Sequence, residues 1–216
     1  MVGDENLSEG PAVFVSHHLG AVGPIAVLAS LSVRVYPWVI SEMMDSAKSA
    51  AYLNQDFVEP QLHIPPPLSL WVAKEISKVS ARLFRLAGCI PVSQGEQLHE
   101  TFEQSVELLI EGKSLLIFPE DPSKVIDPHY KMTPFKKGFA RLGEMYYERT
   151  GQSLRFYPLA VHLDSYCVKI GRPIAYNSKN HPANERLRIK NVLESSIREM
   201  YLNMGMKGFP GISIQS

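Results

Sequence analysis

Short apolar segments alternate with longer segments of helical periodicity along this chain, and the alternation constrains the fold more than any other feature. The strand-type segments lie at 11–16, 32–41, 88–92, 114–120, 154–163 and 165–171, and the helix-type segments at 23–32, 68–86, 95–113, 133–151 and 183–203. This order predicts an α/β fold with a mixed, largely parallel central sheet flanked by helices. Because 216 residues fit one such domain and we find no repeat or linker, we expect a single domain, 1–216.

The charge balance argues against a nucleic-acid partner. Acidic and basic residues number 22 each, so no overall field draws the protein to a polyanion. Cys89 and Cys167 lie in apolar strand-type segments, as is typical of reduced core thiols in a cytoplasmic protein. The start, MVGDENLSEG, is too acidic for a secretion signal, and no apolar stretch approaches the length of a membrane span. We expect a cytoplasmic protein, with peripheral membrane contact left open.

Two adjacent histidines, His17 and His18, follow the first strand-type segment and precede a helix-type one. Functional residues gather at the carboxyl ends of parallel strands, so one of the pair could serve as a general base. Polar residues at a strand–helix corner are also common without any catalytic role. The pair alone leaves both interpretations open.

Several blocks in one order carry a family resemblance. His17-His18, then four residues and Gly23, is similar to a block Asn-His-x4-Asp. The segment 88–94 follows Gly-x-Ile-x-Val-x-Arg except for Gln94 at the Arg position, and Phe118-Pro119-Glu120 matches the start of Phe-Pro-Glu-Gly-Thr-Arg-Ser. PFKKGFARLG (134–143) and FYPLAV (156–161) complete the series. Together, over residues 12–175, they resemble the glycerolipid acyltransferase superfamily, which includes lysophosphatidic acid and glycerol-3-phosphate acyltransferases.

The resemblance implies an acyltransferase of phospholipid biosynthesis with that superfamily's fold. It would move a fatty acyl group from acyl-CoA or acyl carrier protein to the hydroxyl of a glycerolipid-like acceptor of the 1-acylglycerol-3-phosphate type. His18 would be the general base and Glu120 would support it, and no metal or bound cofactor is implied. Gly23 departs from the pattern, because the family's aspartate there orients the histidine; Glu120 or Asp121 could replace it.

The acceptor site also departs from the family pattern. Gln94 cannot grip a phosphate as the family's arginine does, although Lys136 and Lys137, in the expected first turn of the helix 133–151, could attract an anion. The resemblance thus implies a substrate-binding set of His17, Gly23, Gln94, Phe118, Pro119, Asp121, Lys136 and Lys137. Gly23 and Gln94 also favour an alternative, a weakly active or inactive homologue that binds acyl-CoA or lipid. A third reading is an unrelated α/β binding domain.

Apolar residues keep helical spacing from Leu68 to Leu86. We interpret this stripe as a core-facing surface. Its alternative is a membrane-surface or acyl-chain role, because Trp71 and Phe84 stand beside basic residues at 74, 78, 82 and 85. His162 and Asp164 share one face of a strand, but without a third ligand they indicate polar sheet surface rather than a metal site.

Overall fold

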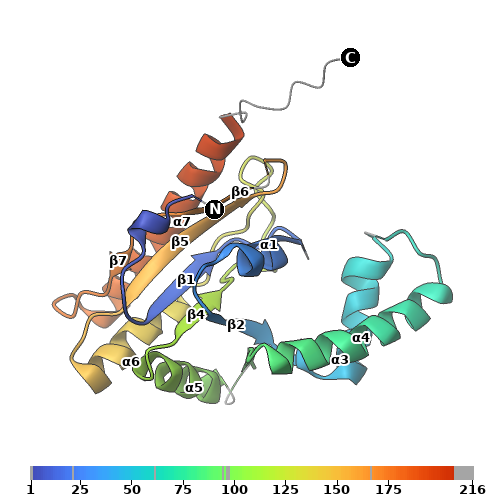
Figure 1. Ribbon diagram of the computed structural model, residues 1–216, viewed down its shortest axis with the longest axis horizontal. Helices are drawn as coiled ribbons and strands as arrows, with labels where there is room; N and C mark the ends of the chain where they lie inside the picture. The colour runs from blue at the N-terminus through green and yellow to red at the C-terminus, as the bar shows by residue number, and fades with distance from the viewer. Residues whose placement is uncertain are drawn as a thin grey trace. The chain divides into compact units, whose positions relative to one another are not determined.

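The computed structural model describes residues 2–20, 22–60, 62–93, 95, 98–165 and 167–206 (Figure 1). The chain divides into two compact units. Residues 1–35 and 109–216 form the first, here called the sheet unit, and residues 36–108 form the second, the middle unit. The single domain expected over 1–216 remains a prediction.

The sheet unit is built on a mixed, mainly parallel sheet. Its strands are β1 (Ala12–Ser16), β4 (Ser114–Ile117), β5 (Arg155–His162), β6 (Cys167–Ile170) and β7 (Ile174–Ala175). β1 lies between β4 and β5 and runs parallel to both, with Val13 opposite Leu115 on one side and Phe156 on the other (Figure 1). β6 and β7 pair antiparallel with β5. The carboxyl ends of the parallel strands β1 and β4 therefore lie next to each other on the same side of the sheet.

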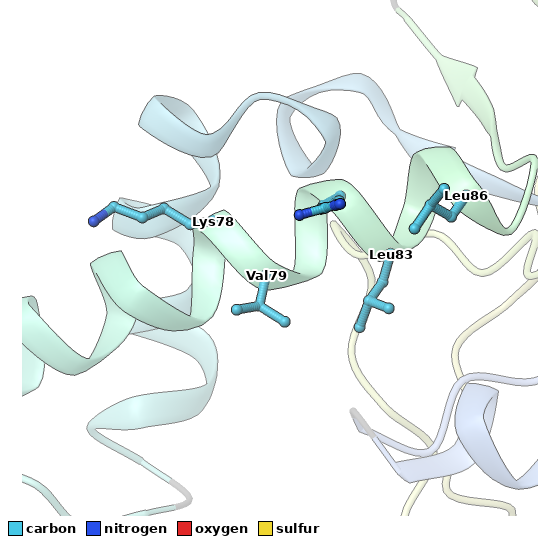
Figure 2. Close-up of a pocket in the computed structure, with 5 residues that line it drawn as sticks. Lys78, Val79, Leu83 and Leu86 are labelled. Atoms are coloured by element: carbon cyan, nitrogen blue, oxygen red, sulfur yellow. The ribbon is translucent and has the colours of Figure 1, made fainter.

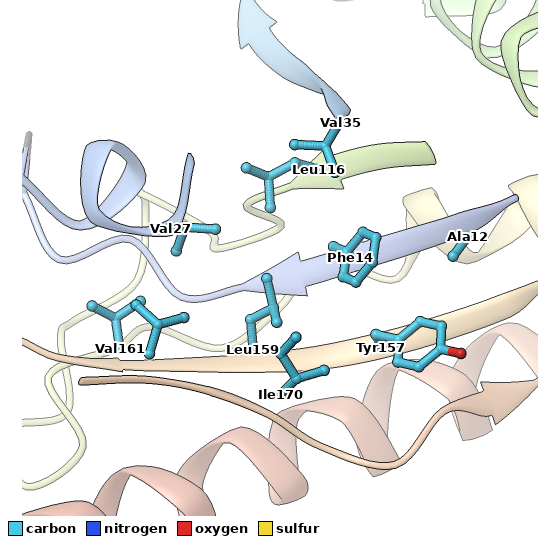
Figure 3. Packing of buried hydrophobic residues seen from close by; sticks show 10 residues of the cluster. Ala12, Phe14, Val27, Val35, Leu116, Tyr157, Leu159, Val161 and Ile170 are labelled. Atoms are coloured by element: carbon cyan, nitrogen blue, oxygen red, sulfur yellow. The ribbon is translucent and has the colours of Figure 1, made fainter. Parts of the chain in front are cut away.

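The core of this unit explains why β1 and β4 are almost entirely apolar. Every residue of both strands is buried, as expected for strands covered on both faces. Phe14 stacks on Tyr157 with ring centroids 5.3 Å apart, and Val27 of the helix α1 (Val22–Ser30) joins the same cluster (Figure 3). α1 is thereby seated on the sheet directly after the His17-His18 pair.

The remaining helices of the sheet unit are α6 (Arg141–Thr150) and α7 (Pro182–Met206), with 3-10 turns at Asp4–Asn6 and Gly138–Ala140. α6 ends where predicted, because Gly151 adopts the left-handed conformation (φ 69°) that caps a helix. Its predicted start at Thr133 is wrong. The backbone N–H of Asp121 donates to the Pro134 carbonyl (3.0 Å) and that of Lys136 to the Pro119 carbonyl (2.8 Å), so residues 134–136 are extended.

The middle unit is mostly helical. It contains α2 (Ser41–Met44), α3 (Ser46–Leu53), a π-helical turn (Asn54–Val58), α4 (Leu68–Leu86) and most of β2 (Val35–Ile40) and α5 (Leu98–Ile110), with β3 (Ile90–Val92) parallel to β2. Trp38 of β2 donates its indole N–H to Ser105 of α5 (2.8 Å) and packs edge-on against Phe102. These contacts hold α5 on the β2–β3 pair.

α4 has the bounds that its periodicity predicts, but the core-facing interpretation of its apolar stripe is wrong. Leu68, Trp71, Val79, Leu83 and Leu86 are all more than half exposed. The buried positions are the small residues Ser69, Ala73, Ser77 and Ala81. The physical reason is close packing: small side chains let α4 approach α3, and the Ser77 hydroxyl donates to the Ser46 carbonyl across that contact (2.9 Å).

Among the helices in the described ranges, none combines the length and apolar character that crossing a membrane requires. Cys89 and Cys167 are free and buried, as predicted for core thiols. Burial raises the pKa of the Cys89 thiol to about 11.

Candidate active site

His18 lies just after the carboxyl end of β1, where a functional residue was predicted. β1 ends at Ser16 and α1 begins at Val22, so His18 stands in the short connection between them. Residues 118–120 leave the neighbouring strand β4 on the same side of the sheet. The backbone N–H of His18 donates to Oε1 of Glu120 over 2.8 Å, so parallel pairing brings together two blocks 102 positions apart in sequence.

Glu120 uses both carboxylate oxygens to hold backbone. Its Oε2 accepts hydrogen bonds from the backbone N–H (3.2 Å) and the hydroxyl (3.3 Å) of Thr133. Partial burial raises the pKa of the Glu120 carboxyl, and the bonds from His18 and Thr133 offset part of that rise. The Glu120 carboxylate thus joins the backbone of His18 to Thr133.

The imidazole of His18 is exposed and packs edge-on against Phe118, with ring centroids 5.4 Å apart. Partial desolvation by neighbouring protein atoms disfavours the charged ring and lowers the pKa of His18 below its usual 6.5. A neutral ring can accept a proton. Within the described ranges, the Glu120 carboxylate binds the backbone of His18 but not its ring.

Asp121, the other carboxylate expected to reach the ring, is committed elsewhere. Its Oδ1 accepts from the backbone N–H (3.1 Å) and hydroxyl (2.8 Å) of Ser123 and lies 3.5 Å from Nζ of Lys136. The Ser123 bonds, followed by the Lys136 charge, lower the pKa of the Asp121 carboxyl. These are its side-chain partners in the described part of the chain, so the orienting role of the family's aspartate is unfilled there.

Gly23 lies in the first turn of α1 and is buried. Its N–H donates to the carbonyl of Leu19 (3.1 Å), and a Cβ added at this position would lie 3.1 Å from Cβ of Leu19. That separation is tighter than an ordinary van der Waals contact, so a side chain here requires Leu19 to yield. Glycine at position 23, where the family motif has aspartate, therefore lies in a tightly packed place.

His17 and His18 have different surroundings, since His17 is buried and His18 is exposed. The His17 ring is fully buried, edge-on to Tyr201 of α7 at 5.5 Å, and His162 packs against the same tyrosine at 5.1 Å. Neither ring nitrogen has a hydrogen-bond partner in the described ranges. Burial lowers the pKa of His17 to about 4, against a smaller opposing effect of the Val161 and Leu159 carbonyls. The ring predicted to bind substrate is thus enclosed by protein.

Lys136 and Lys137 are exposed but do not stand in the first turn of α6, which begins at Arg141. The expected support from helix N-terminal amides is therefore wrong for these two lysines, since they precede the Gly138–Ala140 turn. Pro119 is buried and Phe118 half-buried beside His18. Gln94, expected at the acceptor site, lies outside the described residues.

One structural element near the site was missed from sequence. Glu194 of α7 is 7% exposed and accepts the backbone N–H of Phe135 (2.9 Å). It pairs with Nζ of Lys190 (2.7 Å) and with Arg198 (2.8 Å), one helical turn away on either side. The signal in the sequence was this Lys-x3-Glu-x3-Arg spacing, but the spacing alone does not show that the carboxylate is buried.

The site thus combines a histidine of lowered pKa, just after a strand end, with a glutamate that binds its backbone N–H. A family model for acyltransferases matches residues 54–161, half of the chain. The chain belongs to the acyltransferase family. This confirms the resemblance found on the short blocks. The matched range includes the Phe118-Pro119-Glu120 block but not His18.

The fold of this chain is similar to that of a solved structure. The crystal structure of the 1-acyl-sn-glycerophosphate (LPA) acyltransferase PlsC from Thermotoga maritima matches with a TM-score of 0.54 and 14% sequence identity. The match covers 97% of this chain and 72% of that one. A search of curated proteins finds no match. His162 and Asp164 join no group of three or more potential metal ligands in the described residues.

Proposed function

We propose that this protein transfers a fatty acyl group from an acyl-CoA or acyl-carrier-protein thioester to the hydroxyl of a glycerolipid-like acceptor of the 1-acylglycerol-3-phosphate type. The single observation that carries the proposal is the His18–Glu120 contact. It joins the histidine to the Phe-Pro-Glu block of an acyltransferase family member at the carboxyl edge of β1 and β4.

In this mechanism His18 is the general base. Its neutral ring takes the proton of the acceptor hydroxyl as the oxygen attacks the thioester carbonyl carbon. The tetrahedral intermediate then expels the thiolate, and the imidazolium returns the proton to that sulfur. An ester bond forms, a thioester bond breaks, and no oxidant, reductant or metal is consumed. Phe118 limits the rotation of the ring by edge-on packing.

Glu120 contributes through the backbone rather than through the ring. By holding the His18 N–H and Thr133 together, its carboxylate keeps the base at the sheet edge while substrate binds. The exposed cations Lys124, Lys136 and Lys137 follow in the same region of chain and supply positive charge for an acceptor phosphate or the phosphates of CoA. The protein would work on the cytoplasmic side of a membrane that supplies its lipid acceptor.

The second candidate is an acyl-CoA or lipid-binding homologue with little turnover. Two observations favour it: no carboxylate bonds to the His18 ring within the described ranges, and Gly23 packs tightly where the family keeps one. Loss of the orienting aspartate in a serine-protease triad lowers turnover by about 10⁴, so a comparable loss here would leave only slow transfer.

One assay separates the two candidates. Thiol release from palmitoyl-CoA is measured with lysophosphatidic acid, glycerol-3-phosphate or neutral alcohols as acceptor, for the wild type, His18→Ala and His99→Ala. His99 is an exposed residue of α5 and serves as the matched control. Acceptor-dependent release that is lost only in His18→Ala supports the transferase. Release equal in all three proteins, with acyl-CoA binding retained, supports the binding protein.

A further inference from the structure

α4 presents several large apolar side chains to solvent. Leu68, Trp71, Val79, Leu83 and Leu86 are between 56% and 69% exposed, and their spacing of three, four or eight residues puts them on one face of the helix. We call these five residues the α4 outer face. Figure 2 shows Val79 and Leu83 pointing to the same side of the helix. Exposed apolar surface gathered in this way marks an interaction site.

The opposite face already seats the helix, so the outer face is not needed to hold α4 in place. Ala73, Ser77 and Ala81 are fully buried, and the Ser77 hydroxyl donates to the carbonyls of Ser46 and Lys74. A soluble helix ordinarily buries its leucines and exposes its serines. In α4 this order is reversed.

Basic residues flank the outer face along one side. Lys74, Lys78 and Arg82 follow one another at intervals of four residues, and Arg85 follows three later, so all four lie between the outer face and the buried face. Glu75, the acidic residue of this helix, lies between Trp71 and Val79 on the outer face, and its charge is paired with Lys78 (2.7 Å). Lys78 and Arg82 line an open pocket together with Val79, Leu83 and Leu86, so cationic and apolar groups are adjacent (Figure 2).

We propose that the α4 outer face docks on the surface of an anionic phospholipid bilayer. Large apolar side chains would enter the boundary between headgroups and acyl chains, and Trp71 is of the residue type that favours that depth. The lysines and arginines would keep their charged ends at the headgroup phosphates while their stems cover apolar surface. Because the chain carries no net charge, this attraction must be local, and the basic flank of α4 supplies it.

Vesicle sedimentation tests the inference on the full chain, without acyl donor. Binding is measured to phosphatidylcholine vesicles and to vesicles of equal parts phosphatidylcholine and phosphatidylglycerol. Two double variants probe the site: Trp71→Ser with Leu83→Ser, and Lys78→Gln with Arg82→Gln. Matched controls carry the same changes elsewhere, Leu187→Ser with Val192→Ser on α7 and Arg172→Gln with Lys179→Gln, which are also exposed.

We expect the wild type to bind the anionic vesicles and both α4 variants to bind them at least about tenfold more weakly, with the controls unchanged. We also expect a blue shift of tryptophan fluorescence on the anionic vesicles that Trp71→Phe abolishes, because Trp38 is held by Ser105. Circular dichroism identifies any variant that fails to fold, and Leu86→Ser then replaces it.

The proposal is overturned if the wild type does not bind the anionic vesicles, or if the α4 variants bind them as well as the wild type does. It is also overturned if the wild type is a dimer, the α4 substitutions dissociate this dimer, and vesicle binding does not change. The last outcome would make the face a contact between two copies of the chain. The test is separate from that of the proposed function. Transfer to a short-chain lysophosphatidic acid without vesicles reports on the His18 site and should be unaffected by the α4 variants.

Discussion

The backbone N–H of His18 donates to Oε1 of Glu120 over 2.8 Å, while the Glu120 carboxylate makes no hydrogen bond to the His18 ring within the described ranges. The glutamate of the Phe-Pro-Glu block therefore fixes where the histidine stands. It does not fix which ring nitrogen carries the proton. Glu120 and an orienting carboxylate would therefore affect different properties of His18: its position and its tautomer.

Glu120→Gln should weaken both the fold and the activity. The NH₂ group of the glutamine would face a backbone N–H, and two donors cannot form a hydrogen bond. The backbone N–H of either His18 or Thr133 would therefore lose its acceptor. We expect the free energy of unfolding to fall by about 1–3 kcal/mol and acyl transfer to fall with it. Urea unfolding and thiol release measure the two effects, with Glu107→Gln on the exposed side of α5 as control. An unchanged protein would show that these contacts have no role.

The pH dependence of transfer should report the His18 ring. Desolvation lowers its pKa, so the fraction of neutral base should stay high until the pH is below the usual 6.5. We expect kcat/KM to fall on the acid side with a midpoint below 6.5. A midpoint above 6.5, or an acid limb that persists in His18→Ala, would assign the limb to another group.

His17 should make stability depend on pH between about 4 and 6.5. Its pKa is about 4 in the folded chain against an ordinary 6.5, so the unfolded chain binds more protons in this window. Stability is therefore full above 6.5 and is lost as the pH falls toward 4, by about 3 kcal/mol in total. Unfolding curves recorded across this range should lose this slope in His17→Leu and keep it in His99→Ala. A slope that is the same in both variants would contradict the assignment.

Adding the missing carboxylate should raise turnover if the proposed mechanism holds. Gly23→Asp alone is crowded, because its Cβ would lie 3.1 Å from Cβ of Leu19. We therefore expect Gly23→Asp combined with Leu19→Ala to increase acyl transfer by roughly ten- to a hundredfold over Gly23→Ala with Leu19→Ala, within the range that an orienting aspartate supplies. Equal rates in the two double variants would mean that position 23 does not face the ring.

Glu194→Gln should destabilise the sheet unit. The change removes the buried carboxylate that balances Lys190 and Arg198 and accepts the Phe135 N–H. We expect a loss of about 2–4 kcal/mol, because two partly buried cations lose their counter-charge. Glu199→Gln, on the exposed side of the same helix, should change the unfolding free energy by less than about 0.5 kcal/mol. A similar loss in both variants would show that burial of Glu194 contributes nothing.

The sequence alone was enough to predict the α/β class and the family, because local periodicity and short ordered blocks carry that information. The strands β1, β4 and β5 and the helix α4 follow from this local pattern. The same holds for the place of His18 at a strand end, since parallel strands share an edge.

Tertiary structure decided which helix face is buried and which distant segments pair, and sequence periodicity does not contain this information. A helical pattern shows that α4 has two faces but not which one is buried, and close packing of Ser77 and Ala81 selected the small-residue face. Thr133 and Pro134 favour a helix start locally, but pairing with residues 119–121 overrode that preference. The partner of Glu120 was likewise set by a contact across 102 positions, because hydrogen bonds between distant segments depend on the completed sheet rather than on neighbours in the sequence.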